Sequence, residues 1–227
     1  SFGMLSDAME DYLKAIYVLQ REEGPPVSTS AVAEYLDKTA PTVTSMMEKL
    51  ADRGLIEREK YRGVELTDEG RTVALEVIRH HRLLEAYLAE QLDFDWSEVH
   101  DEADTLEHHI SEDLERRMAE ALGDPAVDPH GDPIPTETLD PVDEDAGERL
   151  TSFEEGDRVA VSRVPHRDRE ELDYLADAGL TPGTEIEIVD VAPFGMVTVR
   201  LADGEEQSLP EEVADAIRVR AAVDEVA

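Results

Sequence analysis

The chain of 227 residues contains no cysteine, which excludes disulfide bonds, thiolate metal sites and cysteine nucleophiles. No apolar run approaches the ~18 residues that a membrane helix needs. The sequence also lacks an early apolar segment followed by a small-residue cleavage site, so we identify no secretion signal. These absences predict a cytoplasmic protein without a membrane segment.

Lysine is scarce as well. Of the 21 basic residues only four are lysines, at positions 14, 38, 49 and 60, and 56 acidic residues give a net charge of −35. Such acidity is typical of disordered segments, but 41% hydrophobic residues in regular patterns favour a folded chain. An acidic, lysine-poor surface also resembles proteins of extreme halophiles, because molar salt shortens the Debye length to ~3 Å and screens self-repulsion. We therefore predict a halophilic source.

The charge is distributed unevenly along the chain. Residues 37–62 carry six basic and five acidic side chains, whereas residues 101–150 carry seventeen acidic side chains and three arginines. Contacts from Lys and Arg to phosphate normally supply affinity for nucleic acid. The acid is therefore concentrated away from the segment in which such contacts are expected.

The first part of the chain has the pattern of helix, turn, helix and hairpin. Apolar residues recur at helical spacing over 6–22, a short helix follows Ser28 or Ser30, and a third helix starts at Thr39 with Pro41 in its first turn. Two short alternating strands flank a predicted turn at Arg62-Gly63, and a long helix is predicted over 68–91. This order predicts a winged helix-turn-helix. The second helix of such a pair, which here is the third helix of the chain, enters the DNA major groove.

The predicted DNA contacts come from the third helix and from the hairpin wing. Small hydroxyl and methyl groups at the start of the helix suit bases and phosphates, and basic wing residues suit phosphates. The alternative is a packed helical unit whose hairpin contacts another protein. The predicted DNA-binding residues are Thr39, Pro41, Thr42, Thr44 and Ser45 of the helix and Arg58, Lys60 and Arg62 of the wing.

Carboxylates and imidazoles recur at helical spacing further along the chain. Asp104, Glu107 and His108 stand at i, i+3 and i+4, so a helix would present all three on one face. His81 and Glu85 repeat the i, i+4 spacing on an earlier helix. Imidazole combined with carboxylate suits manganese, iron(II), zinc or cobalt. A DNA-reading unit with metal ligands suggests a switch in which metal occupancy controls DNA binding.

The remainder of the chain divides into a predicted linker and a predicted β domain. Residues 123–147 are rich in Pro, Asp and Gly without sustained periodicity, which is typical of a linker. From residue 153 the pattern changes to period two, with predicted strands over 158–161, 185–189, 196–201 and 217–219 and a short helix over 168–178. This pattern predicts a small all-β barrel.

Several stretches together resemble the diphtheria toxin repressor family of metal-dependent transcriptional regulators. They are residues 9–13, 40–44, 59–63, 81–85, 99–103 and 106–109, together with 131–135, where Asp132 replaces the family's Asn. The resemblance covers essentially the whole chain. It implies a multi-domain, mainly α protein with a small β domain: a winged helix-turn-helix over 4–75, a helical metal-binding and dimerisation domain with an acidic linker over 76–149, and an SH3-like domain of the ferrous transport accessory type over 150–221.

The resemblance also implies two metal sites in each subunit. One would contain His81, Glu85, His100, Asp168 and Glu171, and the other Asp11, Asp104, Glu107 and His108. The iron branch usually has Met at position 11 and Cys at position 104, so two aspartates shift the site toward the manganese branch. That branch, however, has a second carboxylate where this chain has Lys14. The resemblance thus leaves the choice between Fe²⁺ and Mn²⁺ open.

The function that follows is a metal-dependent regulator, most simply a repressor of metal-uptake genes, that binds a palindromic operator as a homodimer. The alternatives are a winged-helix regulator with purely structural metal sites and a metal buffer without DNA contact. We expect no enzymatic activity, because a catalytic metal needs an open position and no His-Glu-x-x-His pattern is present. Four other histidines are expected to have no metal role: His80 and His109 as solvated or packing residues, and His130 and His166 as lone loop residues. Asp168 and Glu171 could also be ordinary surface acids.

Overall fold

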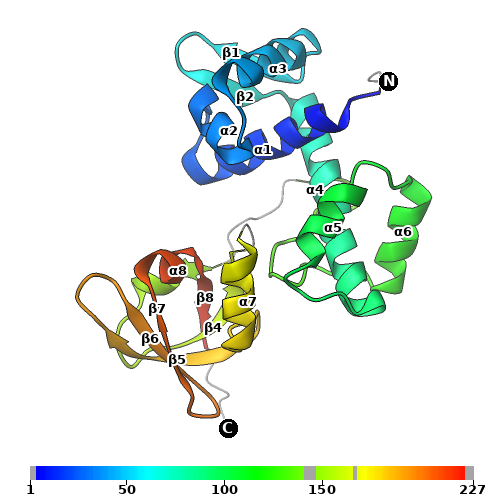
Figure 1. The fold of residues 1–227 in the computed structure, drawn as a ribbon. Coiled ribbons are helices and arrows are strands. Elements are labelled where there is room, and N and C mark those ends of the chain that lie inside the picture. Colours follow the sequence, from blue (N-terminus) through cyan, green and yellow to red (C-terminus); the bar gives the residue numbers. More distant parts are fainter. Residues whose placement is uncertain (1–3, 141–146, 166–167, 223–227) are drawn as a thin grey trace. The chain divides into compact units, whose positions relative to one another are not determined.

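The computed structural model describes residues 4–140, 147–165 and 168–222. It divides into two compact units. The first comprises the described parts of 1–81, 104–115 and 135–142, and the second those of 82–103, 116–134 and 143–227. The fold is mainly helical with one small β domain, as predicted (Figure 1). Within the described residues, no helix has the length and apolar character needed to cross a membrane.

The first unit begins with the predicted helix-turn-helix and its wing. The hydroxyl of Ser6 accepts the N–H of Met9 at 3.2 Å and starts the first helix, and the hydroxyl of Ser28 accepts the N–H of Ala31 at 3.1 Å and starts the second. The elements are α1 (Asp7–Glu23), α2 (Thr29–Leu36), α3 (Ala40–Asp52), β1 (Ile56–Glu59) and β2 (Gly63–Leu66). The predicted order of elements is therefore confirmed.

A single apolar core holds these elements together. Leu13 and Ile16 of α1, Val43 and Leu50 of α3, and Leu66 of β2 are all buried in it. Each is an apolar side chain at the helical or strand spacing seen in the sequence, so burial of these residues orients α3 with its polar face outward.

The wing turn differs from the prediction by a few residues. Gly63 belongs to β2, and the turn is formed by residues 60–62, with Tyr61 at φ 65°. Gly63 is required at its position because a Cβ there would lie 2.0 Å from the carbonyl oxygen of Val27, which pairs with Val64. The close approach of two backbones, which the sequence pattern does not show, sets this register.

Three helices follow the wing: α4 (Asp68–Leu92), α5 (Val99–Leu106) and α6 (Glu112–Ala121). The sequence predicted that one helix would carry Asp104, Glu107 and His108, but α5 ends at Leu106. Glu107 and His108 therefore lie in the turn that follows α5. The hydroxyl of Ser111 then accepts the N–H of Leu114 at 3.1 Å near the start of α6, close to the predicted break.

The predicted linker is partly wrong. Residues 127–134 form a compact loop in which the backbone of Val127 pairs with that of Pro133. Asp128, His130 and Asp132 are buried in this loop. The prolines and the glycine interrupt the hydrophobic periodicity because they form tight turns. The loop is nevertheless packed, so the missing periodicity was misread as a linker. Residues 141–146 of the predicted linker lie outside the described residues.

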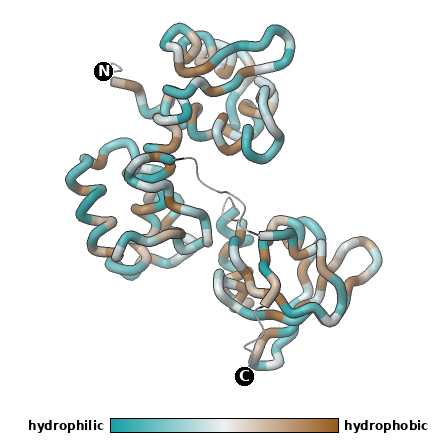
Figure 2. The backbone as a smooth tube through the Cα atoms, turned by 180° about the vertical axis from the view of Figure 1, so that it is seen from behind, coloured by the Kyte–Doolittle hydropathy of each residue, from teal (hydrophilic) through white to brown (hydrophobic). Residues whose placement is uncertain are grey.

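The elements of the β domain are β3 (Glu148–Arg149), a 3-10 turn (Leu150–Ser152), β4 (Arg158–Arg163), α7 (Arg169–Asp177), β5 (Glu185–Val191), β6 (Val197–Leu201), β7 (Glu206–Leu209), α8 (Glu211–Ala216) and β8 (Arg218–Ala221). The strands form a six-stranded antiparallel sheet in the order β3-β8-β4-β5-β6-β7 (Figure 1). Hydrophobic and hydrophilic residues alternate along its strands (Figure 2), as period-two strands with one buried face require. The prediction missed β3, β7 and α8.

Candidate metal sites and nucleic-acid surface

Three of the four ligands predicted for one site come together in the first unit. Asp11 of α1 and Glu107 and His108 of the turn after α5 each offer a ligand atom, and these atoms lie within 4.8 Å of one another. Nε2 of His108 is 2.8 Å from Oδ1 of Asp11 and 3.5 Å from Oε1 of Glu107. We call Asp11, Glu107 and His108 the α1 site.

Glu10 orients the imidazole of the α1 site. Nδ1 of His108 is 2.7 Å from Oε2 of Glu10, so Nδ1–H donates to this carboxylate and Nε2 points toward Asp11. Such a hydrogen bond from the second ring nitrogen is the usual support of a histidine that binds metal. Sequence reasoning missed Glu10, and its position beside Asp11 was the only available signal.

The carboxylates of the α1 site stabilise a proton on its imidazole. Burial opposes the charge of His108, but the hydrogen bond to Glu10 and the charges of Asp11 and Glu107 raise the pKa of the imidazole. Burial also raises the pKa of Glu10 and of Asp11. A metal ion at the α1 site would therefore compete with a proton on His108.

Lys14 lies beside the α1 site and contacts the fourth predicted ligand. Its ammonium Nζ is 3.1 Å from Oε2 of Glu107, 3.2 Å from Oδ1 of Asp104 and 3.3 Å from Nδ1 of His81. Burial opposes the charge of Lys14, but Glu107 and Asp104 raise the pKa of its ammonium. The structure thus places a resident cation between Asp104 and Glu107.

His81 also faces this cluster. Its Nδ1 is 2.5 Å from Oε2 of Glu107 and 3.2 Å from Oδ1 of Asp104. Glu107 is almost fully buried, with 1% of its side chain exposed, so its charge depends on Lys14, His81 and His108 for compensation.

Among the other predicted ligands, Glu85 and His100 come together in the second unit. Nδ1 of His100 is 3.0 Å from Oε1 of the fully buried Glu85. Asp168 caps α7 instead, accepting the N–H groups of Glu170 at 2.9 Å and Glu171 at 3.3 Å. Within the described ranges, neither Asp168 nor Glu171 belongs to a group of three metal-type donors. Their ligation stays a prediction.

The histidines that the sequence assigned no metal role have different environments. His80 is buried, with Nε2 at 2.6 Å from Glu115, which also binds Nε of Arg79 at 2.5 Å. His109 is exposed, 3.2 Å from Asp7. His166 lies outside the described residues.

His130 contradicts the prediction of a lone loop residue. Its side chain is fully buried, and Nδ1 lies 3.0 Å from Oε2 of Glu85. Sequence reasoning could not find this contact, because 45 residues separate the two side chains and the loop containing His130 had the composition of a linker.

The predicted DNA-reading residues of α3 lie at the surface. Thr39, Pro41, Thr42 and Ser45 are exposed and Thr44 is half-buried. Thr39 occupies the N-cap position without capping the helix through its side chain, since its hydroxyl bonds to that of Thr42 at 2.8 Å. The start of α3 therefore presents hydroxyl and methyl groups to a ligand.

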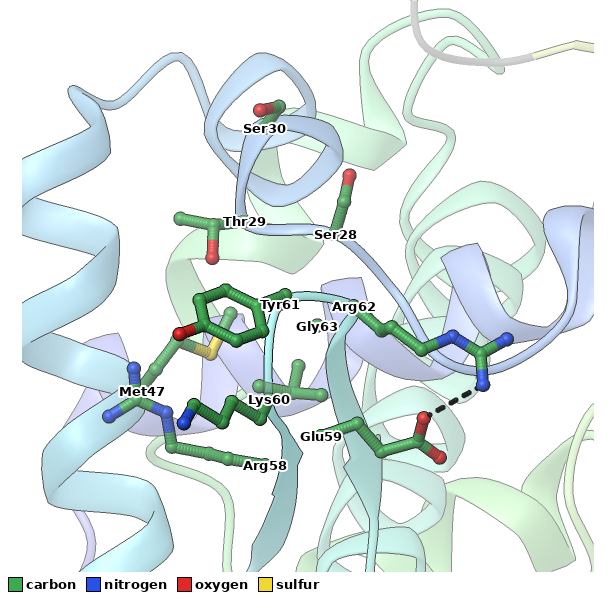
Figure 3. Close-up of a pocket in the computed structure, with 11 residues that line it drawn as sticks. Ser28, Thr29, Ser30, Met47, Arg58, Glu59, Lys60, Tyr61, Arg62 and Gly63 are labelled. Atoms are coloured by element: carbon green, nitrogen blue, oxygen red, sulfur yellow. Dashed lines mark hydrogen bonds and ion pairs between the residues drawn. The ribbon is translucent and has the colours of Figure 1, made fainter.

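The wing and the start of α2 line a groove (Figure 3). The hydroxyl residues Ser28, Thr29 and Ser30 lie across it from Arg58 and Lys60. Exposed basic side chains and hydroxyls are suitable partners for phosphate.

Two other wing contacts shape this groove. Arg62 pairs with Glu59 at 3.2 Å, and Nζ of Lys60 lies 5.1 Å from the ring centroid of Tyr61. Tyr61 is 94% exposed at the wing tip, so an aromatic ring flanked by basic groups projects into solvent.

Comparison with known families matches nearly the whole chain. Residues 4–64 match the family described as "Iron dependent repressor, N-terminal DNA binding domain", and residues 67–136 match "Iron dependent repressor, metal binding and dimerisation domain". Residues 148–221 match the FeoA domain.

Individual relatives agree with these matches. The chain is 37% identical over 226 residues to the iron-dependent repressor IdeR of Mycobacterium tuberculosis, covering 95% of this chain and 97% of the relative. It is 35% identical over 224 residues to the diphtheria toxin repressor of Corynebacterium glutamicum, covering 95% and 96%.

Solved structures of similar proteins include metal complexes. A manganese-dependent transcriptional repressor in complex with manganese superposes with a TM-score of 0.86 at 37% identity, covering 94% of this chain and all of that chain. ScaR with bound Zn²⁺ has a TM-score of 0.80 at 31% identity, covering 94% and 99%.

Proposed function

Because this chain belongs to the family of iron-dependent and diphtheria toxin repressors, which are metal-dependent DNA-binding transcriptional regulators, we propose that it represses metal-uptake genes when Fe²⁺ or Mn²⁺ is bound. The observation that carries this proposal is the α1 site. Asp11 belongs to a helix of the DNA-reading unit, and its carboxylate lies against His108 and Glu107 from the turn after α5.

The donor set of the α1 site fits such a metal. Two carboxylates and one imidazole are hard and borderline ligands that suit Mn²⁺ and Fe²⁺. Glu10 holds the imidazole with Nε2 toward Asp11, as a ligating histidine requires. Lys14 already supplies positive charge between Glu107 and Asp104, which favours one ion at the α1 site over a two-metal cluster.

The proposed switch acts through α1. A divalent cation held by Asp11, Glu107 and His108 would take the place of the proton on His108 and offset the charges of the two carboxylates. Asp11 then ties α1 to the turn after α5, and α1 shares its core with α3 through Leu13 and Ile16. In a two-fold dimer, this constraint would set the two α3 helices at the separation of ~34 Å that a palindromic operator presents.

The energetic requirement is a difference in affinity. The DNA-competent arrangement must bind the metal more tightly than the other arrangements, and DNA must in turn strengthen metal binding by the same factor. We propose that the start of α3 reads bases while Arg58, Lys60 and Arg62 contact phosphates.

We also propose that the protein acts in a cytoplasm of high salt concentration. The low lysine content and the net charge of −35 suit a haloarchaeal-type cytoplasm with molar salt, in which counterion release contributes little to DNA affinity. His81, Glu85, His100, Asp168 and Glu171 stay candidates for a second metal site with a structural role. The role that we propose is regulatory and not catalytic.

The test compares variants of the α1 site with a neighbouring control. His108→Ala and Asp11→Asn should lose metal-stimulated DNA binding, measured by fluorescence anisotropy with Mn²⁺, with anaerobic Fe²⁺ and with chelator. His109→Ala, which changes the adjacent exposed histidine, should behave like the wild type. Sedimentation should show dimers for all three. The switch would be refuted if His108→Ala still bound DNA only when metal was added.

One observation favours the alternative of a regulator with purely structural metals. His108 and Lys14 already compensate the carboxylates of the α1 site, so this part of the structure is satisfied without a metal ion. In that case DNA binding should be equal in chelator and in Mn²⁺, and only thermal stability should respond to metal.

A further inference from the structure

A second group of metal-type side chains is buried in the second unit, apart from the α1 site. Glu85 of α4 and Asp128 and His130 of the 127–134 loop each offer a ligand atom, and these atoms lie within 4.8 Å of one another. The exposed fractions of the three residues are 0%, 4% and 0%. Three polar side chains are seldom buried together unless they bind one another or a ligand.

The hydrogen bonds of His130 determine which of its nitrogens carries a proton. Nε2 is 2.8 Å from the carbonyl oxygen of Trp96, which can only accept, so Nε2–H donates to it. Nδ1 then faces Oε2 of Glu85 at 3.0 Å. A neutral imidazole would direct its lone pair at a carboxylate, so a proton on Nδ1 or on Glu85, or a metal ion, must lie between the two groups. A backbone carbonyl on the far nitrogen is the usual support of a metal-binding histidine.

Asp128 adds an acceptor that a single proton between His130 and Glu85 would leave unsatisfied. Its Oδ1 accepts the backbone N–H groups of His130 and Asp132, both at 2.9 Å. Within the part of the chain that the structure describes, no group donates a hydrogen bond to its buried Oδ2. A proton between His130 and Glu85 leaves Oδ2 unsatisfied, at a penalty of about 1–3 kcal/mol, whereas a cation bound by all three side chains would satisfy it.

The charges around the group also favour a cation. Three buried carboxylates, those of Glu85, Asp128 and Asp132, lie in this region. Arg163 forms an ion pair with Asp132. A divalent cation at this group would add positive charge where three carboxylates are buried together.

We propose that Glu85, Asp128 and His130 form a further binding site for a divalent transition metal ion, of the Mn²⁺, Fe²⁺, Co²⁺ or Zn²⁺ class. Ligand bonds of about 2.1 Å at right angles place neighbouring donor atoms about 3 Å apart, which agrees with the 3.0 Å between Nδ1 of His130 and Oε2 of Glu85. The backbone N–H of Val164 binds the carbonyl of His130 at 3.0 Å and holds the loop in place. This site uses Asp128 and His130, which belong to neither predicted ligand set.

The single tryptophan of the chain reports directly on this site. The ring centroids of Trp96 and His130 are 5.3 Å apart. Co²⁺ has an open d shell and quenches the emission of an adjacent indole, whereas Zn²⁺ does not. Titration of the full-length protein with Co²⁺ should quench Trp96, and added Zn²⁺ should restore the emission by competition.

Variants separate this site from the α1 site. His108→Ala removes a ligand of the α1 site and should leave the quenching curve unchanged. Asp128→Asn keeps an oxygen for the loop amides but removes the charge, and it should weaken the quenching affinity at least tenfold. His130→Gln should do the same, while His109→Gln serves as the control. Circular dichroism in chelator verifies that each variant folds, and equilibrium dialysis should count one Co²⁺ fewer per chain in Asp128→Asn than in the wild type.

The outcomes are distinct. Equal quenching and equal cobalt content in the wild type, Asp128→Asn and His130→Gln would overturn the proposal and leave a buried imidazolium–carboxylate pair. Loss of quenching in His108→Ala alone would also overturn it, because the reporting ion would then depend on the α1 site. Failure of the DNA switch would leave these fluorescence results unaffected, so the two proposals are tested separately.

Discussion

Replacing Lys14 with methionine would remove the ammonium from the cluster beside the α1 site and keep most of the side-chain volume. At 3.1 Å and an effective dielectric constant of about 20, the attraction between Lys14 and Glu107 is about 5 kcal/mol before desolvation is subtracted. Asp104 is about half exposed, so its pair with Lys14 contributes little. Removing one partner of a buried pair typically destabilises a protein by about 3–5 kcal/mol, which is our expected loss for Lys14→Met in chelator.

The same change should strengthen metal binding. Without the ammonium, Glu107 and Asp104 lose one of the positive groups that face them. A divalent cation bound there would restore the electrostatic stabilisation that Lys14 gives the wild type. If about 3 kcal/mol is recovered, Mn²⁺ affinity rises by about a hundredfold. The variant should also bind one more Mn²⁺ per chain than the wild type, in the place that Lys14 occupies.

Urea unfolding followed by circular dichroism, in molar KCl with chelator and then with Mn²⁺, measures both effects. Lys38→Met, which changes an exposed lysine, is the matched control and should leave both curves unchanged. Calorimetric titration with Mn²⁺ gives the affinity and the stoichiometry. Equal unfolding midpoints for Lys14→Met and the wild type in chelator, with no tighter Mn²⁺ binding, would refute the reasoning.

Three further predictions concern other parts of the chain. The raised pKa of His80 and the lowered pKa of Glu115 mean that their pair stabilises fully between the ordinary values of 4.5 and 6.5. This stability is lost as pH falls through the pKa of Glu115 or rises through that of His80. In chemical denaturation, Glu115→Gln should flatten the dependence of stability on pH and lower the free energy of unfolding by about 3 kcal/mol. An unchanged pH profile would contradict the assignment. Gly131→Ala should lower the melting temperature by several degrees. The reason is that Gly131 has φ 87° and that a Cβ there would lie 1.9 Å from the carbonyl oxygen of Ser162. A melting curve like that of the wild type would show that the loop can relax. Lys60→Gln should weaken binding of all DNA sequences alike and reduce the salt slope by about 1, whereas a changed sequence preference would mean that Lys60 reads bases.

Local signals in the sequence predicted the N-terminal unit well. Ser6 and Ser28 start their helices through side-chain hydrogen bonds, and the apolar spacing of α1 and α3 identified the buried faces. These features depend on residues within a turn or two of one another, so a sequence pattern is enough to show them.

The candidate sites were only partly predictable, because their geometry depends on contacts between distant residues. The spacing of Asp104, Glu107 and His108 predicted one helical face, yet α5 ends at Leu106 and Lys14 separates Asp104 from the other two. Only the folded chain shows that an ammonium from α1 reaches this point.

The 127–134 loop was misread for a related reason. Its prolines and glycine removed the periodicity that marks buried segments, although Asp128 and His130 are buried as deeply as core leucines. Long-range contacts of polar side chains leave no periodic trace in a sequence, so the loop could be recognised as a candidate site only from its contact with Glu85.

The most direct test of the central claim is selection of bound duplexes from randomised DNA by the purified protein in molar KCl. The selection is carried out in chelator, in Mn²⁺ and in anaerobic Fe²⁺ at matched free concentration. Metal control through the α1 site predicts enrichment of a palindromic sequence only when metal is present, with the more effective ion identifying the physiological one. Equal enrichment of the same sequence in chelator would contradict the claim, and so would the absence of enrichment under every condition.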